Sequence, residues 1–262
     1  MISEWLLTET NQKRLKRNLP EVAVIPTSAI EPHNLHLPIG QDFLHTSIIT
    51  ERSVEKAWRK TRKVIALPAL PYGVDINLMD FPMAIHVSQK VLDAILFDII
   101  SSLLHYNIKK IVILNGHGGN DFAPFIRQTQ SDLNIHLFQI DWWKVGSDKY
   151  VDIFEEVDDH AGEMESSVAL ALYPELVEME NAKNGETKSY SIDALNKGWV
   201  KTSRRFSKLN DHCAVGNPYK ASADKGDKYI KLIVDRISKF LIDLSNTPID
   251  KNFPFKRDKS NK

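Results

Sequence analysis

Short apolar runs alternate with longer amphipathic stretches along this chain. The runs that predict buried β-strands are Val22–Ile25, Val64–Leu67, Lys110–Leu114 and His136–Ile140. Strands separated by helices of this length usually pair in parallel, because each crossover returns the chain to the same end of the sheet. The pattern therefore predicts an α/β protein with three α/β/α layers and a mainly parallel central sheet.

Three helices stand out from the spacing of their apolar residues. The clearest begins after Ser88, a residue type that caps helix N-termini. Its apolar positions are Val91, Leu92, Ile95, Leu96, Ile99, Ile100, Leu103 and Leu104. We expect a second helix from Gly162 through Leu172, stopping at Pro174, and a third from Lys225 to Leu244.

Residues 181–224 are polar, lack periodicity and are long for a connection, which is typical of a functional lid or an oligomer contact. No linker rich in Pro, Gly or Ser divides the 262 residues, so we expect one domain over residues 1–262.

The overall charge and the cysteine content exclude several classes of protein. The chain has 34 basic and 34 acidic side chains, and this balance gives no electrostatic footprint for nucleic acid or an anionic membrane. A single cysteine, Cys213, excludes an intramolecular disulfide framework and fits a reducing compartment. No stretch approaches 18 apolar residues, and no signal peptide is apparent at the start. We therefore expect a cytoplasmic protein with neither a nucleic-acid nor a membrane partner.

A dense cluster of polar side chains follows the first predicted strand. Residues 31–42 read Glu-Pro-His-Asn-Leu-His-Leu-Pro-Ile-Gly-Gln-Asp, with possible ligands at Glu31, His33, His36 and Asp42. The carboxyl ends of strands are where open α/β sheets form their ligand crevices. Mixed oxygen and nitrogen donors suit zinc, manganese or iron. A solvated acidic loop has the same composition, so this cluster alone leaves both interpretations open.

Two further polar clusters lie downstream. Asn115-Gly-His-Gly-Gly-Asn120 follows the third strand, where His117 is either a ligand or a solvent-facing residue of a tight turn. The segment 158–167 opens a helix with Glu163 and Glu165 in its first turn, where the helix dipole also favours acidic residues. Convergence of the three clusters on one sheet edge would make a two-metal hydrolytic site.

Taken together, these motifs resemble the creatininase (creatinine amidohydrolase) family. Its acidic-x-His, His-Leu-Pro and Asp signature, its Asn-Gly-His-Gly-Gly-Asn loop and its His-Ala-Gly-x-x-Glu-[Ser/Thr]-Ser segment occur in order at 31–42, 115–120 and 160–167. Weaker similarities lie at 68–73, which ends in Pro-Tyr-Gly, and at 215–226, before the last helix. Asn34 is a departure, because the family usually has Gly at this position.

The resemblance implies a binuclear site with two divalent metal ions per chain, zinc, manganese or iron. The implied ligands are Glu31 and His117 for one ion, His33 and Glu165 for the other, and Asp42 as the bridge. Glu163 is an open alternative to Glu165. A hydroxide bridging the ions would attack the substrate carbonyl, and His160 would be the catalytic proton carrier.

Candidates for substrate contact are His36, Tyr72, Gly118, Gly119 and Trp143. His36 is expected to orient a metal ligand or to contact substrate. Either Trp142 or Trp143 could form a wall for a small flat substrate, while the other packs in the core, and Tyr72 has the same two possible roles. Gly119 stands where creatininases proper carry an acidic ligand, so Glu165 would take that place and creatinine itself is not the expected substrate.

We therefore expect a metal-dependent hydrolase of a small cyclic amide or a related C–N bond. Family branches without that acid include enzymes acting on amides in purine-like rings, peptidases of redox-cofactor precursors and hydrolases of cyclic ketones in inositol catabolism. The first alternative is thus a hydrolase that cleaves a C–C bond in a cyclic polyol ketone. The second is a catalytically silent oligomeric binding protein of the same fold. The resemblance also implies a homo-oligomer, with a hexamer as the expected form.

Overall fold

The central sheet has four parallel strands in the order β2-β1-β3-β4. The computed structural model describes residues 2–256, and Met1 and residues 257–262, the ends of the predicted domain, lie outside the described part. The strands are β1 (Val22–Thr27), β2 (Val64–Ala66), β3 (Lys110–Asn115) and β4 (His136–Asp141). Val22 pairs with Val64 on one side and with Lys110 on the other. The predicted strands and their parallel pairing are confirmed.

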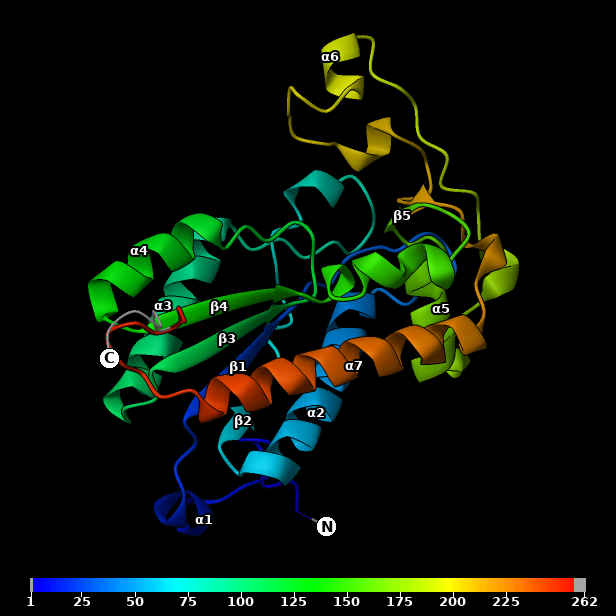
Figure 1. Cartoon of the computed structure of the whole chain (residues 1–262). Helices are drawn as coiled ribbons and strands as arrows, with labels where there is room; N and C mark the ends of the chain where they lie inside the picture. Colours follow the sequence, from blue (N-terminus) through cyan, green and yellow to red (C-terminus); the bar gives the residue numbers. More distant parts are fainter. Residues whose placement is uncertain (1, 257–262) are drawn as a thin grey trace.

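Helices cover both faces of the sheet (Figure 1). One face packs against α3 (Gln89–His105) and α4 (Ala123–Leu133), and the other against α2 (Gln41–Thr61) and α7 (Ala223–Asn246). Successive strand residues point to opposite faces. Val24 accordingly joins the α2–α7 cluster, while Ile25 joins the α3–α4 cluster. This arrangement confirms the predicted three-layer α/β/α fold.

The predicted helices are present with small changes at their ends. α3 begins directly after Ser88, and α5 (Glu163–Leu172) ends before Pro174. α7 starts two residues earlier than expected, because the Ser222 side chain accepts a hydrogen bond from the Lys225 backbone amide. Two apolar positions of α3, Val91 and Ile95, are 49% and 41% exposed rather than buried.

Helix α2 was not predicted, because its buried face is largely polar. The buried polar residues of this face are Gln41, Asp42, His45, Thr46, Thr50 and Ser53. Apolar periodicity is the main sequence signal for a helix, and this face does not carry it. Asp42 therefore lies in the first turn of a long helix, which fixes its backbone.

The remaining elements are short. They are α1 (Gln12–Arg17), α6 (Asp193–Asn196), the antiparallel pair β5 (Asp158–His160) and β6 (Val215–Gly216), and the 3-10 turns at Ile76–Leu78, Trp142–Lys144, Ser147–Asp152, Pro174–Leu176, Met179–Asn181, Phe206–Lys208 and Pro218–Lys220. None of the helices within residues 2–256 combines the length and apolar character needed to cross a membrane.

The long segment 181–224 leaves the body of the protein around α6 and then returns to it (Figure 1). Residues 203–208, here called the strap, pack against the loop that follows the Pro-Tyr-Gly motif. Ser203 Oγ donates to Asn77 Oδ1 at 2.5 Å, and Arg205 donates to both carboxylate oxygens of Asp80 at 2.5 and 2.7 Å. Phe206 is buried in a cluster with Leu78. The strap is thus fastened by both polar and apolar contacts.

Candidate functional site

The three polar clusters meet beside the carboxyl ends of β1 and β3. Three groups of side chains each have ligand atoms within 4.8 Å of one another. These groups are Glu31–Asp42–His117, His33–Asp42–Glu165 and Glu31–His33–His160. Loops and helices from distant parts of the chain supply the residues, since the carboxyl ends of parallel strands lie at one edge of the sheet.

Asp42 lies between the first two groups. The His117 Nδ1 atom is 3.1 Å from both Glu31 Oε1 and Asp42 Oδ2. On the other side, His33 Nε2 is 3.1 Å from Asp42 Oδ1 and 3.8 Å from Glu165 Oε2. One carboxylate therefore faces two imidazoles, each with a second carboxylate beside it.

This donor set fits divalent metal ions. Glu31, His33, Asp42 and His117 are all at least 96% buried, since their exposed fractions are 2%, 1%, 2% and 4%. Glu31 Oε2 and His33 Nε2 make no hydrogen bond within the described residues. Buried charges of one sign are costly unless a partner neutralises them, and carboxylate oxygens with imidazole nitrogens are ligands that zinc, manganese and iron accept.

The Glu31–His36 loop depends on Asn34, which has the left-handed φ of +57°. This conformation is the one that Gly adopts readily and that Asn tolerates better than most residues. The Asn34 side chain donates to the Lys183 carbonyl at 2.7 Å and accepts from the Leu35 amide at 2.8 Å. Asn34 thus replaces the family's Gly and also ties this loop to the segment 181–224.

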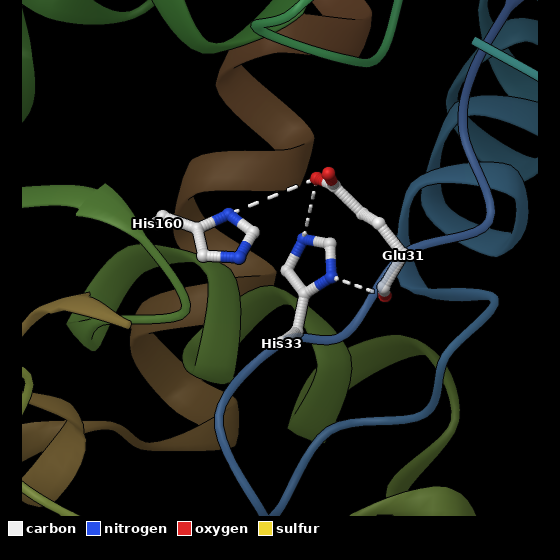
Figure 2. A group of neighbouring side chains, drawn as sticks. All are labelled: Glu31, His33 and His160. Atoms are coloured by element: carbon white, nitrogen blue, oxygen red, sulfur yellow. Dashed lines mark hydrogen bonds and ion pairs between the residues drawn. The ribbon is translucent and has the colours of Figure 1, made fainter. Parts of the chain in front are cut away.

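His160 is buried at the end of β5, and Figure 2 shows its ring directed toward the Glu31 carboxylate beside His33. Its Nε2 lies 2.9 Å from the Pro32 carbonyl oxygen, an acceptor, so Nε2 carries the proton. Its Nδ1 lies 3.8 Å from Glu31 Oε1. Burial, with the nearby positive charge of His33, lowers the pKa of His160 to about 4. The imidazole is therefore neutral at pH 7, with the unprotonated Nδ1 facing the candidate ligands.

The two acidic residues at the start of α5 have different surroundings. Glu163 accepts hydrogen bonds from the backbone amides of Glu155 and Glu156 at 2.8 and 2.7 Å, and it forms an ion pair with Lys225. The Glu165 Oε2 atom accepts from the Ala161 amide at 2.6 Å and faces His33. Burial raises the pKa of Glu165 to about 8, although the His33 charge opposes this shift. Glu165 joins a candidate metal group, whereas Glu163 braces the segment before β5.

The glycine-rich loop leaves no room for a side chain at Gly119. A Cβ atom built there would lie 2.3 Å from both His117 Nε2 and the Val74 carbonyl oxygen. A Cβ at Gly118 would meet nothing within 4 Å. The His117 ring thus occupies the space that a side chain at position 119 would enter.

Two buried residues near the site received no role from the sequence. Asp75 is 0% exposed, and its Oδ1 lies 3.2 Å from His117 Nε2. Burial, with the negative charge of Glu31, raises the pKa of Asp75 to about 8. His45 is also 0% exposed, lies 3.3 Å from the Gly116 carbonyl and packs on Trp142. The sequence did not identify His45 because it lies on α2, a helix that was not predicted. For Asp75 the only sequence signal was the Pro-Tyr-Gly motif that precedes it.

A cavity of about 340 Å³ opens beside these groups. Its lining includes Glu31, Asp42, His117, His160 and Glu165, together with Gly118, Gly119, Trp143, Lys144, Arg204 and Phe206. Arg204 and Phe206 come from the strap, and Arg204 forms an ion pair with Asp159 at the same cavity. The length and polarity of the segment 181–224 indicated a functional role for it, but nothing in the sequence singled out these two residues.

The remaining candidates for substrate contact divide between the cavity and other places in the fold. Trp142 is fully buried in the core, while its neighbour Trp143 borders the cavity. Tyr72 is 49% exposed and does not line the cavity. His36 is buried and does not line the cavity, and its Nε2 lies 2.7 Å from Ser166 Oγ. Burial and the His33 charge lower the pKa of His36 to about 4.

Known proteins resemble this chain over most of its length. A crystal structure of a creatinine amidohydrolase-like protein from Bacteroides fragilis superimposes with a TM-score of 0.88 and 33% identity, covering 96% of this chain and 100% of that one. The 3-dehydro-scyllo-inosose hydrolase of Thermotoga maritima is 27% identical over 68% of this chain, although the match spans only 58% of that enzyme. The mycofactocin precursor peptide peptidase of Mycolicibacterium smegmatis is 23% identical over 88% of this chain and 90% of the peptidase.

The sequence profile of the family described as creatininase, creatinine amidohydrolase, matches residues 6–241. This range contains the three polar clusters, the cavity and the strap. The chain belongs to the creatininase family.

Proposed function

We propose that this protein is a binuclear metal-dependent hydrolase of a small cyclic amide or a related C–N bond. The observation that carries the proposal is the pair of ligand groups that share Asp42 and border a cavity together with His160. The named relatives are hydrolases of different substrates, which supports hydrolysis and leaves the substrate to be assigned.

The metal ligands would be those that the family motifs align. Glu31 and His117 would hold one divalent ion, His33 and Glu165 the other, and Asp42 both, with zinc, manganese or iron as suitable ions. When bound, two such ions supply Lewis acidity toward the substrate carbonyl and toward water.

His160 would move the proton. Its Nδ1 carries a lone pair at neutral pH and faces the candidate ligands, while the Pro32 carbonyl holds Nε2–H and fixes the ring. Nδ1 would take the proton from the attacking water and give it to the leaving nitrogen as the C–N bond breaks. A positioned acid–base group of this kind typically contributes about 10²- to 10⁴-fold in rate.

The cavity would select for a small molecule. Its volume is at the lower end of the range for ligand pockets, which begins at about 300 Å³. Trp143 and Phe206 supply flat apolar surfaces, and the backbone at Gly118 and Gly119 allows close approach. The homo-oligomer, with a hexamer as the expected form, is part of the proposal, as are the cytoplasmic location and the single domain.

A second candidate is a hydrolase that cleaves a C–C bond in a cyclic polyol ketone. The match to the Thermotoga inosose hydrolase favours it. The same residues would serve, with His160 Nδ1 delivering its proton to carbon rather than to nitrogen.

Metal content and a substrate panel test the proposal. Metal would be measured per chain by plasma mass spectrometry on untagged protein that has not met a chelator. The loaded protein would then be offered lactams, cyclic ureides, inositol ketones and a linear peptide. We expect close to two ions per chain and hydrolysis of a cyclic amide.

Two results would redirect the assignment. Turnover of the inositol ketone alone would establish the second candidate. A protein that holds no manganese, zinc or iron, and hydrolyses nothing, would be a silent binding protein of this fold.

A further inference from the structure

We propose that Asp75 is a positioning residue for His117, and that its carboxylate fixes the imidazole with Nδ1 directed at Glu31 and Asp42. The inference rests on the proposed function, because it concerns the binding of one of the two ions. It adds a residue that neither the sequence motifs nor the ligand groups include.

The Asp75 side chain is buried, and it faces the candidate site through the His117 ring. Its side chain is 0% exposed, and neither carboxylate oxygen makes a hydrogen bond within the described residues. The Glu31 carboxyl group also faces the His117 ring, at 3.1 Å from Nδ1. Burying a carboxyl group costs free energy unless it is paired, and the His117 ring is the ionisable partner that this group contacts, which points to a role in the site.

The surroundings of His117 define the orientation of its ring. Nε2 lies 3.2 Å from the Val74 carbonyl oxygen and 3.2 Å from Asp75 Oδ1. Both neighbours are acceptors, so Nε2 carries a proton and Nδ1 is the atom available to a cation. A carboxylate beside the second nitrogen of a metal-binding histidine typically fixes its tautomer and raises its basicity.

Gly73 and Gly119 lie next to the His117 ring, and neither has a side chain that could hold the ring in one orientation. A Cβ at Gly73 would lie 3.1 Å from His117 Cδ2, and a Cβ at Gly119 would lie 2.3 Å from Nε2. Both positions lack a side chain, and the ring occupies the space between them. Asn120 Oδ1 accepts from the Val74 amide at 3.1 Å, which fastens the loop that carries Asp75. The Asp75 carboxylate is thus held where it can orient the ring.

The test is a metal titration of the metal-free protein, with Mn²⁺ followed by electron paramagnetic resonance and Co²⁺ by its absorption bands. In Asp75→Asn we expect one ion to bind about 10- to 100-fold more weakly while the other is unchanged. The Co²⁺ spectrum at saturation should stay as in the wild type, because no ligand is lost. The metal-free variant should unfold at a temperature close to that of the wild type, because Asn keeps the shape of the Asp75 side chain.

Asp80→Asn is the matched control, because this exposed-loop carboxylate binds Arg205 rather than the site. It should leave both metal affinities unchanged. Asp75→Ser serves as a second variant if Asp75→Asn does not fold, and the same loss of affinity is expected.

Three results would overturn the inference. Unchanged affinity for both ions, with or without a lower unfolding temperature, would make Asp75 structural. An altered Co²⁺ spectrum at saturation would make it a ligand. A wild-type protein that binds neither ion would overturn the proposed function as well, whereas two ions with an unaffected Asp75→Asn would overturn the inference alone.

Discussion

A backbone carbonyl holds Nε2 of His160, while Nδ1 faces the Glu31 carboxylate at 3.8 Å. Its Nε2–H donates to the Pro32 oxygen at 2.9 Å, and its ring packs edge-on against Phe206. The other ring nitrogen, Nδ1, is the one that faces the candidate metal ligands. His160 belongs to one of the three groups, but it is the member that lacks contact with the shared Asp42, so we assign it the proton rather than a metal ion.

Replacing His160 by Ala should therefore leave both ions bound and lower kcat by about 10²- to 10⁴-fold. Metal content and steady-state kinetics on the same preparation measure the two effects. His117→Ala and Asp42→Ala are the comparison, because each should remove metal and activity together. Full activity in a metal-free His117→Ala protein would rule out the mechanism.

The two adjacent glycines after His117 should respond differently to alanine. Gly119→Ala places a methyl group 2.3 Å from His117 Nε2 and the Val74 oxygen, so the ring must move and metal content should fall. Gly118→Ala has open space and should retain metal. Equal metal content in the two variants would contradict the packing argument.

Helices α5 and α7 cross at very close range, and one glycine allows this. A Cβ at Gly226 would lie 2.0 Å from the Ser167 carbonyl oxygen. Ser167 follows the Glu165 turn, and its Oγ accepts from the Ser222 amide at 3.1 Å. The Lys-Gly pair at the start of α7 therefore sets how closely this helix approaches the one that carries Glu165.

We expect Gly226→Ala to destabilise the protein by about 1–3 kcal/mol, because the crossing must open to admit a methyl group. Urea denaturation measures this loss. Lys228→Ala, at an exposed position of the same helix, is the control and should change the free energy of unfolding by less than about 0.5 kcal/mol. A Gly226→Ala protein as stable as the control would show that the helices separate at little cost.

At the scale of the whole molecule, several buried groups of the metal-free candidate site have pKa values above their ordinary ones, so they hold protons more tightly when the chain is folded. Burial raises the pKa of Glu165 and of Asp75 to about 8, above the ordinary 4.5 and 3.8. Burial alone would lower the pKa of His33, but the Asp42, Glu165 and Glu31 charges raise it to about 10 from 6.5. Burial alone would also lower the pKa of His117, but the charges of Glu31 and Asp42 raise it.

These shifts predict how the stability of the metal-free protein depends on pH. From pH 7 to 9 the folded chain binds more protons than the unfolded chain at Glu165, Asp75, His33 and His117, so its stability should fall as pH rises. The pKa values of His160 and His36 are lowered to about 4 from 6.5, so these residues change the stability mainly below pH 6.5 and not between pH 7 and 9. Metal ions would replace the protons and remove the decline.

The measurement is the unfolding temperature between pH 7 and 9, with and without a chelator. The chelated protein should melt at a lower temperature as pH rises, and the metal-loaded protein should change less. A chelated protein that becomes more stable toward pH 9 would contradict the predicted protonation of the site.

The sequence alone determined the layers of the fold and the main polar clusters of the candidate site. Val22–Ile25 and the other apolar runs predict strands because burial on both faces requires apolar residues at successive positions. The motifs around Glu31, His117 and His160 are likewise local, since each combines its polar residues with the Gly, Pro or Asn that its turn requires. Local conformation and the buried faces can therefore be predicted without knowing how the chain crosses itself.

Only the tertiary structure decided which of the candidate atoms meet. It separated Glu165, which faces His33, from Glu163, which accepts hydrogen bonds from the backbone amides of Glu155 and Glu156. It also brought Asp75 to His117, and the strap to the cavity, across more than 40 residues of sequence. Helix α2 could not be predicted because its buried face is largely polar, and the elements that cover it come from distant parts of the chain. Such contacts depend on the crossing of distant segments, and no local pattern of residues records that crossing.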